Sequence, residues 1–156
     1  MRVFIHCMFC ILLAFAGCRP VDVYENSAGI PRHAWASNHK VVVELDIKDS
    51  AFYNVIFVIR HTEKYRYTGI VSSITIHDTA AHTQPVAYLK VNVPLVTQRG
   101  SWAGDNVDDL FYHRSKINQP IFFKAGRYRF VLQHEMKENP LPHILNVGVA
   151  IEKAGI

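Results

Sequence analysis

The stretch KVVVELDIK, residues 40–48, alternates apolar and charged side chains with a period of two. This period is typical of a β-strand with one buried face, because successive side chains of a strand point to opposite sides. Only Val42 breaks the alternation. The stretch therefore predicts a half-buried strand whose two faces carry these sets: Val41, Val43, Leu45 and Ile47 against Lys40, Glu44, Asp46 and Lys48.

Further strands are predicted wherever apolar residues alternate or cluster between turn signals. Residues 55–59 are apolar on both parities and rich in β-branched side chains, which favours a central strand buried on both faces. A polar loop at 78–85 and a proline-containing turn at 139–142 interrupt the pattern. The remaining predicted strands are 70–77, 86–93, 110–112, 121–123, 128–136 and 145–151.

No segment after residue 33 has the apolar spacing of a long amphipathic helix. About eight strands without a helix predict an all-β fold, a single antiparallel β-sandwich of jelly-roll or immunoglobulin-like type. Trp35, at the start of the first predicted strand, is expected in the core.

The chain has 156 residues, 49% of them hydrophobic and 19% charged, which suits one globular domain. The formal net charge is +4, from 17 Lys and Arg against 13 Asp and Glu. This modest charge argues against a disordered polyelectrolyte and gives no case for nucleic-acid binding.

All three cysteines lie near the start of the chain, at positions 7, 10 and 18. Arg2 is followed by an apolar run, residues 3–15, that is too short to span a bilayer comfortably and predicts a signal peptide. The run ends in Phe15-Ala16-Gly17-Cys18, which resembles a bacterial lipobox, although Leu is usual where Phe15 stands. We expect residues 1–17 to be a lipoprotein signal peptide and Cys18 to carry the lipid. The alternative is an ordinary secretory signal with an unrelated Cys at its end.

Beyond the signal peptide, the stretch to His33 has Gly29 and Pro31 and little periodicity. It predicts a tether, so the expected organisation is a lipidated Cys and tether at 18–33 and a sandwich domain at 34–156. Two or three acyl chains, as in bacterial lipoproteins, would hold the protein on the membrane.

The sequence offers little chemistry for catalysis, and we expect no enzyme, no cofactor and no metal site. Eight His follow the signal peptide, but none has the spacing of a helical zinc motif, so we expect them at solvated strand ends and in loops. Asp105, Asp108 and Asp109 do not reproduce the ligand spacing of an EF-hand. No Gly-x-Ser-x-Gly motif is present, and no Cys follows Cys18.

Two aromatic features are candidates for contact with a ligand or partner. Trp102 lies in the glycine-containing segment 100–104, and Tyr65, Arg66 and Tyr67 lie in the turn after the central strand. Flat aromatic side chains on a β-sandwich can stack on sugars. The alternative for Trp102 is that it closes one end of the sandwich core.

The order and spacing of several segments resemble the GldH family of gliding-motility lipoproteins of Bacteroidetes, over nearly all of the mature chain. A Pro is usual in the family where Arg66 stands, an Asn where Gly69 stands, and the loop after Trp102 is usually richer in Gly. The matching segments are Cys18, Trp35, 53–55, 60–67, 100–105, 126–130 with Gln133 and Met136, and 144–153.

The resemblance implies a non-catalytic lipoprotein of the cell envelope, linked to the gliding apparatus and to type IX secretion. Family members also occur in Bacteroidetes that do not glide. Two triplets, Asp49-Ser50-Ala51 and Asp78-Thr79-Ala80, resemble the O-glycosylation site of that phylum, which makes Ser50 and Thr79 candidate glycosylation sites.

Two functional hypotheses follow. One is an assembly component that presents a sandwich face to an envelope protein partner; the other is a module that binds an envelope carbohydrate or peptidoglycan. Arg19 follows Cys18, in place of the Asp that retains lipoproteins at the inner membrane of enteric bacteria, which favours the outer membrane.

Overall fold

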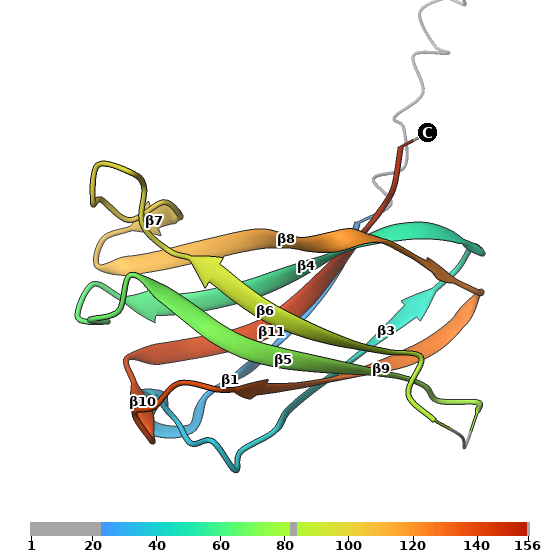
Figure 1. Cartoon of the computed structure of the whole chain (residues 1–156), viewed down its shortest axis with the longest axis horizontal. Coiled ribbons are helices and arrows are strands. Elements are labelled where there is room, and N and C mark those ends of the chain that lie inside the picture. The colour runs from blue at the N-terminus through green and yellow to red at the C-terminus, as the bar shows by residue number, and fades with distance from the viewer. Residues whose placement is uncertain (1–22, 82–83, 156) are drawn as a thin grey trace, which may run out of the picture.

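Two antiparallel β-sheets pack face to face in the computed structural model, which describes residues 23–81 and 84–155 (Figure 1). One sheet has the strand order β1-β11-β4-β8-β7 and the other β3-β9-β5-β6, while the short β2 and β10 pair separately. The strands are β1 (Val23–Gly29), β2 (Ala34–Trp35), β3 (Val41–Ile47), β4 (Ala51–Thr62), β5 (Gly69–Asp78), β6 (Ala87–Pro94), β7 (Asp105–Val107), β8 (Leu110–Phe123), β9 (Gly126–His134), β10 (Leu141–Pro142) and β11 (Ile144–Lys153).

The strand order identifies the sandwich as a jelly roll. The first strand, β1, pairs with the last strand, β11, along its whole length. In an immunoglobulin sandwich the first strand lies beside the second strand instead. The chain also changes sheet between β3 and β4, between β4 and β5, and between β8 and β9, as the winding of a jelly roll requires.

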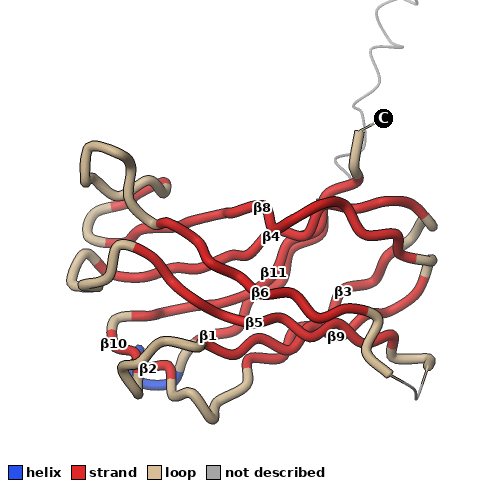
Figure 2. Tube along the Cα trace, viewed as in Figure 1, coloured by secondary structure: helices blue, strands red, loops and turns tan. Residues whose placement is uncertain are grey.

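Figure 2 shows that strands dominate the described chain and that the one helical element is the short 3-10 turn at Pro31–His33. Among the described residues, no helix is both long and apolar enough to cross a membrane. The predicted signal peptide, residues 1–17, and Cys18 lie outside the described residues.

The core lies between the sheets and follows the parities that the sequence indicates. All four apolar positions of the alternating stretch in β3 are buried, whereas Val42 is 48% exposed. In β4, residues 55–59 are buried on both faces, as predicted for a central strand. Trp35 is fully buried, and its indole N–H donates to the carbonyl oxygen of His39 at 2.9 Å.

The structure differs from the tether prediction at residues 23–29, which form β1. This strand has only weak alternation of its own, and its ladder partner β11 lies more than a hundred residues away. Asn26 adds a bond to the other sheet, because its side-chain amide donates to the carbonyl oxygen of Glu44 at 3.1 Å. Distant pairing therefore orders a segment that local sequence does not mark as a strand.

The predicted short strands 110–112 and 121–123 are parts of one strand, β8. β8 pairs with β4 along both halves, and the register shifts between the rungs Tyr53–Ile121 and Val55–Ile117. The shift accommodates Pro120, which cannot donate to a ladder. Pairing with a long buried neighbour therefore overrides the local interruption.

Candidate functional site

A buried histidine pair lies at one end of the five-stranded sheet. His61, on β4, and His113, on β8, are 0% and 4% exposed, and their Nε2 atoms are 2.9 Å apart. The Nδ1 atom of His61 lies 2.8 Å from the carbonyl oxygen of Thr62, which can only accept, so this nitrogen carries the proton. The Nε2 atom of His61 therefore accepts the hydrogen bond that Nε2–H of His113 donates.

Burial keeps this pair uncharged at neutral pH. It lowers the pKa of His113 to about 4, with help from the nearby His61 and against the attraction of Asp105. Burial also lowers the pKa of His61, against the hydrogen bond to Thr62. The expectation that the histidines lie at solvated positions is therefore wrong for His61 and His113, and also for His134, which is 2% exposed.

Trp102 covers the histidine pair from outside. Its ring centroid lies 4.5 Å from that of His61 and 5.6 Å from that of Phe111. The loop that carries Trp102 packs tightly against β8 at Gly104. A Cβ added at Gly104 would come within 2.4 Å of the carbonyl oxygen of Tyr112. The half-buried Trp102 thus closes this end of the core, which was the alternative that the sequence left open.

Of the other predicted contact residues, Tyr65 lies beside Trp102, with ring centroids 6.3 Å apart, and Tyr67 packs on Tyr65. Tyr65 is 3% exposed and its hydroxyl donates to the carbonyl oxygen of Gly69 at 3.1 Å. The hydroxyl of Tyr67 donates to Glu138 at 2.7 Å, and Arg66 forms an ion pair with the same carboxylate at 3.5 Å. The structure therefore brings the predicted set together at one end, with Tyr65 facing the core.

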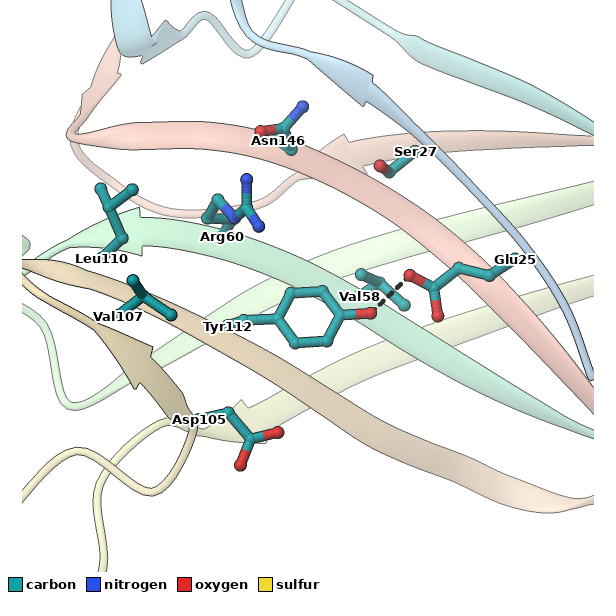
Figure 3. Close-up of a pocket in the computed structure, with 9 residues that line it drawn as sticks. All are labelled: Glu25, Ser27, Val58, Arg60, Asp105, Val107, Leu110, Tyr112 and Asn146. Atoms are coloured by element: carbon teal, nitrogen blue, oxygen red, sulfur yellow. Dashed lines mark hydrogen bonds between the residues drawn. The ribbon is translucent and has the colours of Figure 1, made fainter.

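A hollow of about 530 Å³ opens instead on the outer face of the five-stranded sheet; we call it the sheet hollow (Figure 3). Its floor is apolar, because Val58 is 1% exposed and packs with Ile56 and Ala150 in a second small cluster. Nine residues from β1, β4, β7, β8 and β11 line it: Glu25, Ser27, Val58, Arg60, Asp105, Val107, Leu110, Tyr112 and Asn146.

A polar clasp crosses the sheet at one side of the hollow. The Tyr112 hydroxyl on β8 donates to Glu25 on β1, close to Val58 (Figure 3). Arg114 forms an ion pair with Glu25 at 3.3 Å. Two strands, β4 and β11, separate β1 from β8. Glu25 is level with Lys116, four residues along β8 from Tyr112, so the clasp crosses the sheet on a diagonal. Burial and the bond to Glu25 raise the pKa of Tyr112 to about 12, so it stays a donor.

Four polar side chains of the hollow are available to bond with a ligand or partner. Within the described part of the chain, no hydrogen bond or ion pair is recorded for the side chains of Ser27, Arg60, Asp105 or Asn146. Together they offer a guanidinium, a carboxylate, a carboxamide and a hydroxyl around an apolar floor. Such a mixture of donors and acceptors is suited to binding a polar ligand or a partner surface.

Local sequence reasoning did not find the sheet hollow. Glu25 and Ser27 fell in the predicted tether, and Tyr112 and Asn146 carry no motif. The available signal was parity, because Arg60, Tyr112 and Asn146 occupy outward positions of paired strands. Only the strand order shows that these outward positions lie next to one another.

The candidate glycosylation residues lie at strand ends, where each hydroxyl makes a hydrogen bond. Exposed Ser50 accepts from the backbone N–H of Ala125 at 2.9 Å, and half-buried Thr79 donates to the carbonyl oxygen of Arg127 at 2.9 Å. Modification of either residue stays a prediction. The described residues contain no group of three or more His, Cys, Asp or Glu placed to hold a metal ion.

The chain matches solved structures, among them the following three. A protein from Sulfurospirillum deleyianum is 12% identical, with 85% of this chain and 99% of that chain covered and a TM-score of 0.48. The Cry4Aa toxin from Bacillus thuringiensis is 10% identical, with 83% and 21% covered and a TM-score of 0.47. A family 35 carbohydrate binding module from Clostridium thermocellum is 11% identical, with 85% and 93% covered and a TM-score of 0.39.

A comparison with curated protein sequences finds no match. The family model for the GldH lipoprotein matches residues 22–151, which include every strand of the sandwich except the last two residues of β11 and every residue of the sheet hollow. The match agrees with the resemblance that the sequence motifs indicate, and the chain belongs to the GldH lipoprotein family.

Proposed function

We propose that this lipoprotein is a non-catalytic component of the gliding motility and type IX secretion machinery, anchored through Cys18, and that it binds an envelope protein partner in the sheet hollow. Membership of the GldH lipoprotein family supports a lipid-anchored protein of the cell envelope. The observation that carries the binding role is the hollow itself, with its apolar floor and four uncommitted polar side chains.

The chemistry around the hollow favours binding over catalysis. Ser27 has no recorded hydrogen bond to a base among the described residues, and Glu25 is held by Tyr112 and Arg114. The histidine pair is uncharged and points into the core, on the opposite side of the sheet. A nucleophile needs an adjacent base to be activated, and these groups do not supply one.

The rim of the hollow has the composition of a protein contact surface. Val107 is 74% exposed on the edge strand β7, and Leu110 and Tyr112 lie beside it. Tyr and Arg side chains over an apolar centre often dominate protein–protein binding energies. We expect Arg60 and Tyr112 to be the main contacts.

Photo-crosslinking in cells tests this proposal. A photoreactive phenylalanine analogue at Val107 is expected to yield a discrete adduct with an envelope protein, and Arg60→Ala should reduce its yield about tenfold. The matched control places the analogue at Tyr88, which is 56% exposed on the other sheet. Adducts of equal yield at both positions, or none at Val107, would contradict the proposal.

A glycan is the second candidate occupant of the hollow. Sugar hydroxyls both donate and accept, and so complement Arg60, Asp105 and Asn146 around the Tyr112 ring. Calorimetry with envelope polysaccharides and peptidoglycan fragments separates the two candidates. Binding that Asn146→Ala abolishes, and that Trp102→Ala leaves unchanged, would assign the hollow to a glycan.

We further propose that the anchored protein resides at the outer membrane, because Arg19 follows the lipidated Cys18. Protease treatment of intact cells, compared with permeabilised cells, shows whether it faces the surface or the periplasm. Recovery of the full chain in the inner-membrane fraction would contradict this location.

A further inference from the structure

Two phenylalanines lie exposed at the end of the five-stranded sheet that is farthest from the histidine pair. Phe52 on β4 and Phe122 on β8 are 57% and 48% exposed and form a cross-strand pair with ring centroids 5.3 Å apart. Both point to the outer face of the sheet, because the core face at this end carries Tyr53 and Phe123. Contiguous exposed apolar residues, unlike single ones, are a feature of interaction sites.

The two turns beside the phenylalanine pair are connected by a hydrogen bond. The β3–β4 and β8–β9 turns flank the pair and are joined by the hydrogen bond from Ala125 N–H to the Ser50 hydroxyl. The hydroxyl of Tyr53 donates to the carbonyl oxygen of Asp49 at 3.0 Å within the first turn. Each turn also carries an exposed lysine, Lys48 in one and Lys124 in the other. Each of the two turns beside the rings thus carries one exposed cation, and the first turn also carries Asp49, which forms an ion pair with Lys153 at 3.4 Å.

This end is also the end at which the chain enters the fold. Val23, the first residue of β1, pairs with Glu152, which in turn pairs with Asn54, two residues from Phe52. Strand spacing and rise place the Cα atoms of Val23 and Phe52 about 12 Å apart. Five residue steps separate Cys18 from Val23, so even a fully extended chain spans only about 17 Å. A lipid on Cys18 therefore keeps the phenylalanine pair near the bilayer surface.

We propose that Phe52, Phe122, Lys48 and Lys124 form a membrane-contact surface on which the sandwich rests against the lipid bilayer. The inference rests on the anchor at Cys18 that the proposed function includes. The aromatic rings enter the boundary between head groups and acyl chains, while the ammonium groups face lipid phosphates. The short connection to the anchor favours a lipid surface over a distant protein as the occupant.

The membrane-contact surface would orient the sheet hollow. β4 runs from Phe52 at the bilayer to Arg60 in the hollow, eight residues or about 27 Å farther along the strand. The Arg60 end of the hollow would then lie away from the head groups, where a partner or glycan in the aqueous phase can reach it.

Fluorescence quenching of the full-length lipidated protein tests the orientation. The protein is placed in vesicles of phosphatidylethanolamine and phosphatidylglycerol that contain brominated phosphatidylcholine. Phe122→Trp is expected to be quenched at least about twofold more than Tyr88→Trp, which places the new indole on the other sheet. Trp35 and Trp102 contribute the same background to both variants.

The outcomes separate this proposal from the anchor. If the wild-type chain floats with the vesicles and Phe122→Trp is quenched no more than Tyr88→Trp, the contact surface is wrong and the anchor stands. If the wild-type chain does not float, both are wrong. If lipid-free protein self-associates and the double variant Phe52→Ser, Phe122→Ser abolishes this, the surface belongs to a second copy and the lipid proposal is overturned.

Discussion

The two ends of strand β4 differ: one end buries a polar side chain, and the other end exposes an apolar one. At one end His61, a titratable residue, is fully buried; at the other end Phe52 is more than half exposed. The buried histidine is tolerated because His113 and the carbonyl of Thr62 satisfy both of its ring nitrogens. Within the described part of the chain, the ring of Phe52 makes one aromatic contact, with Phe122. The first end therefore contributes to stability, whereas the second end is available for contact.

Replacing His113 should cause the largest loss of stability. His113→Ala removes a buried ring and leaves Nε2 of His61 without its donor, so we expect the free energy of unfolding to fall by about 3 kcal/mol. Urea denaturation measures the change, and His39→Ala, at an exposed position, is the matched control. A loss below about 1 kcal/mol would show that the pair does not stabilise this end.

Acid should weaken the same end by an intermediate amount. Burial holds the pKa of His113 at about 4 in the folded state, against about 6.5 in an unfolded chain. Between these values the unfolded chain binds more protons, so the stabilisation is complete above pH 6.5 and is lost as the pH falls toward 4, with about 2 kcal/mol already lost at pH 5.

Unfolding at pH 7, 5.5 and 4 measures this dependence. His113→Gln can still donate to His61 but does not titrate, so its stability should fall less steeply with acid than that of the wild type. Equal slopes for the two proteins would mean that His113 is not responsible.

Removing the exposed rings should have the smallest effect on folding. The double variant Phe52→Ser, Phe122→Ser loses one cross-strand aromatic contact and little burial, so we expect a change of about 0.5 kcal/mol in the free energy of unfolding. Thermal unfolding of the variant and the wild type tests this. A loss as large as that of His113→Ala would make the pair a structural element and remove the contrast between the two ends.

Parity along the chain predicted those parts of the fold that depend on neighbouring residues. The buried face of β3, the doubly buried centre of β4 and the core position of Trp35 are all confirmed. Parity failed where a distant partner decides the structure, as in β1, and where a strand continues through a proline, as in β8. The histidine pair was missed because its members are 52 positions apart in sequence.

By itself, the sequence determined the fold class, the core face of most strands and the family, because alternation and motif order are local properties of the chain. The tertiary structure alone decided between jelly-roll and immunoglobulin-like topology, since that choice depends on which distant strands pair. It also decided that Trp102 closes the core, and that Glu25, Arg60 and Asn146 meet in one hollow. These residues lie on different strands, and only the sheet order brings their side chains to one face.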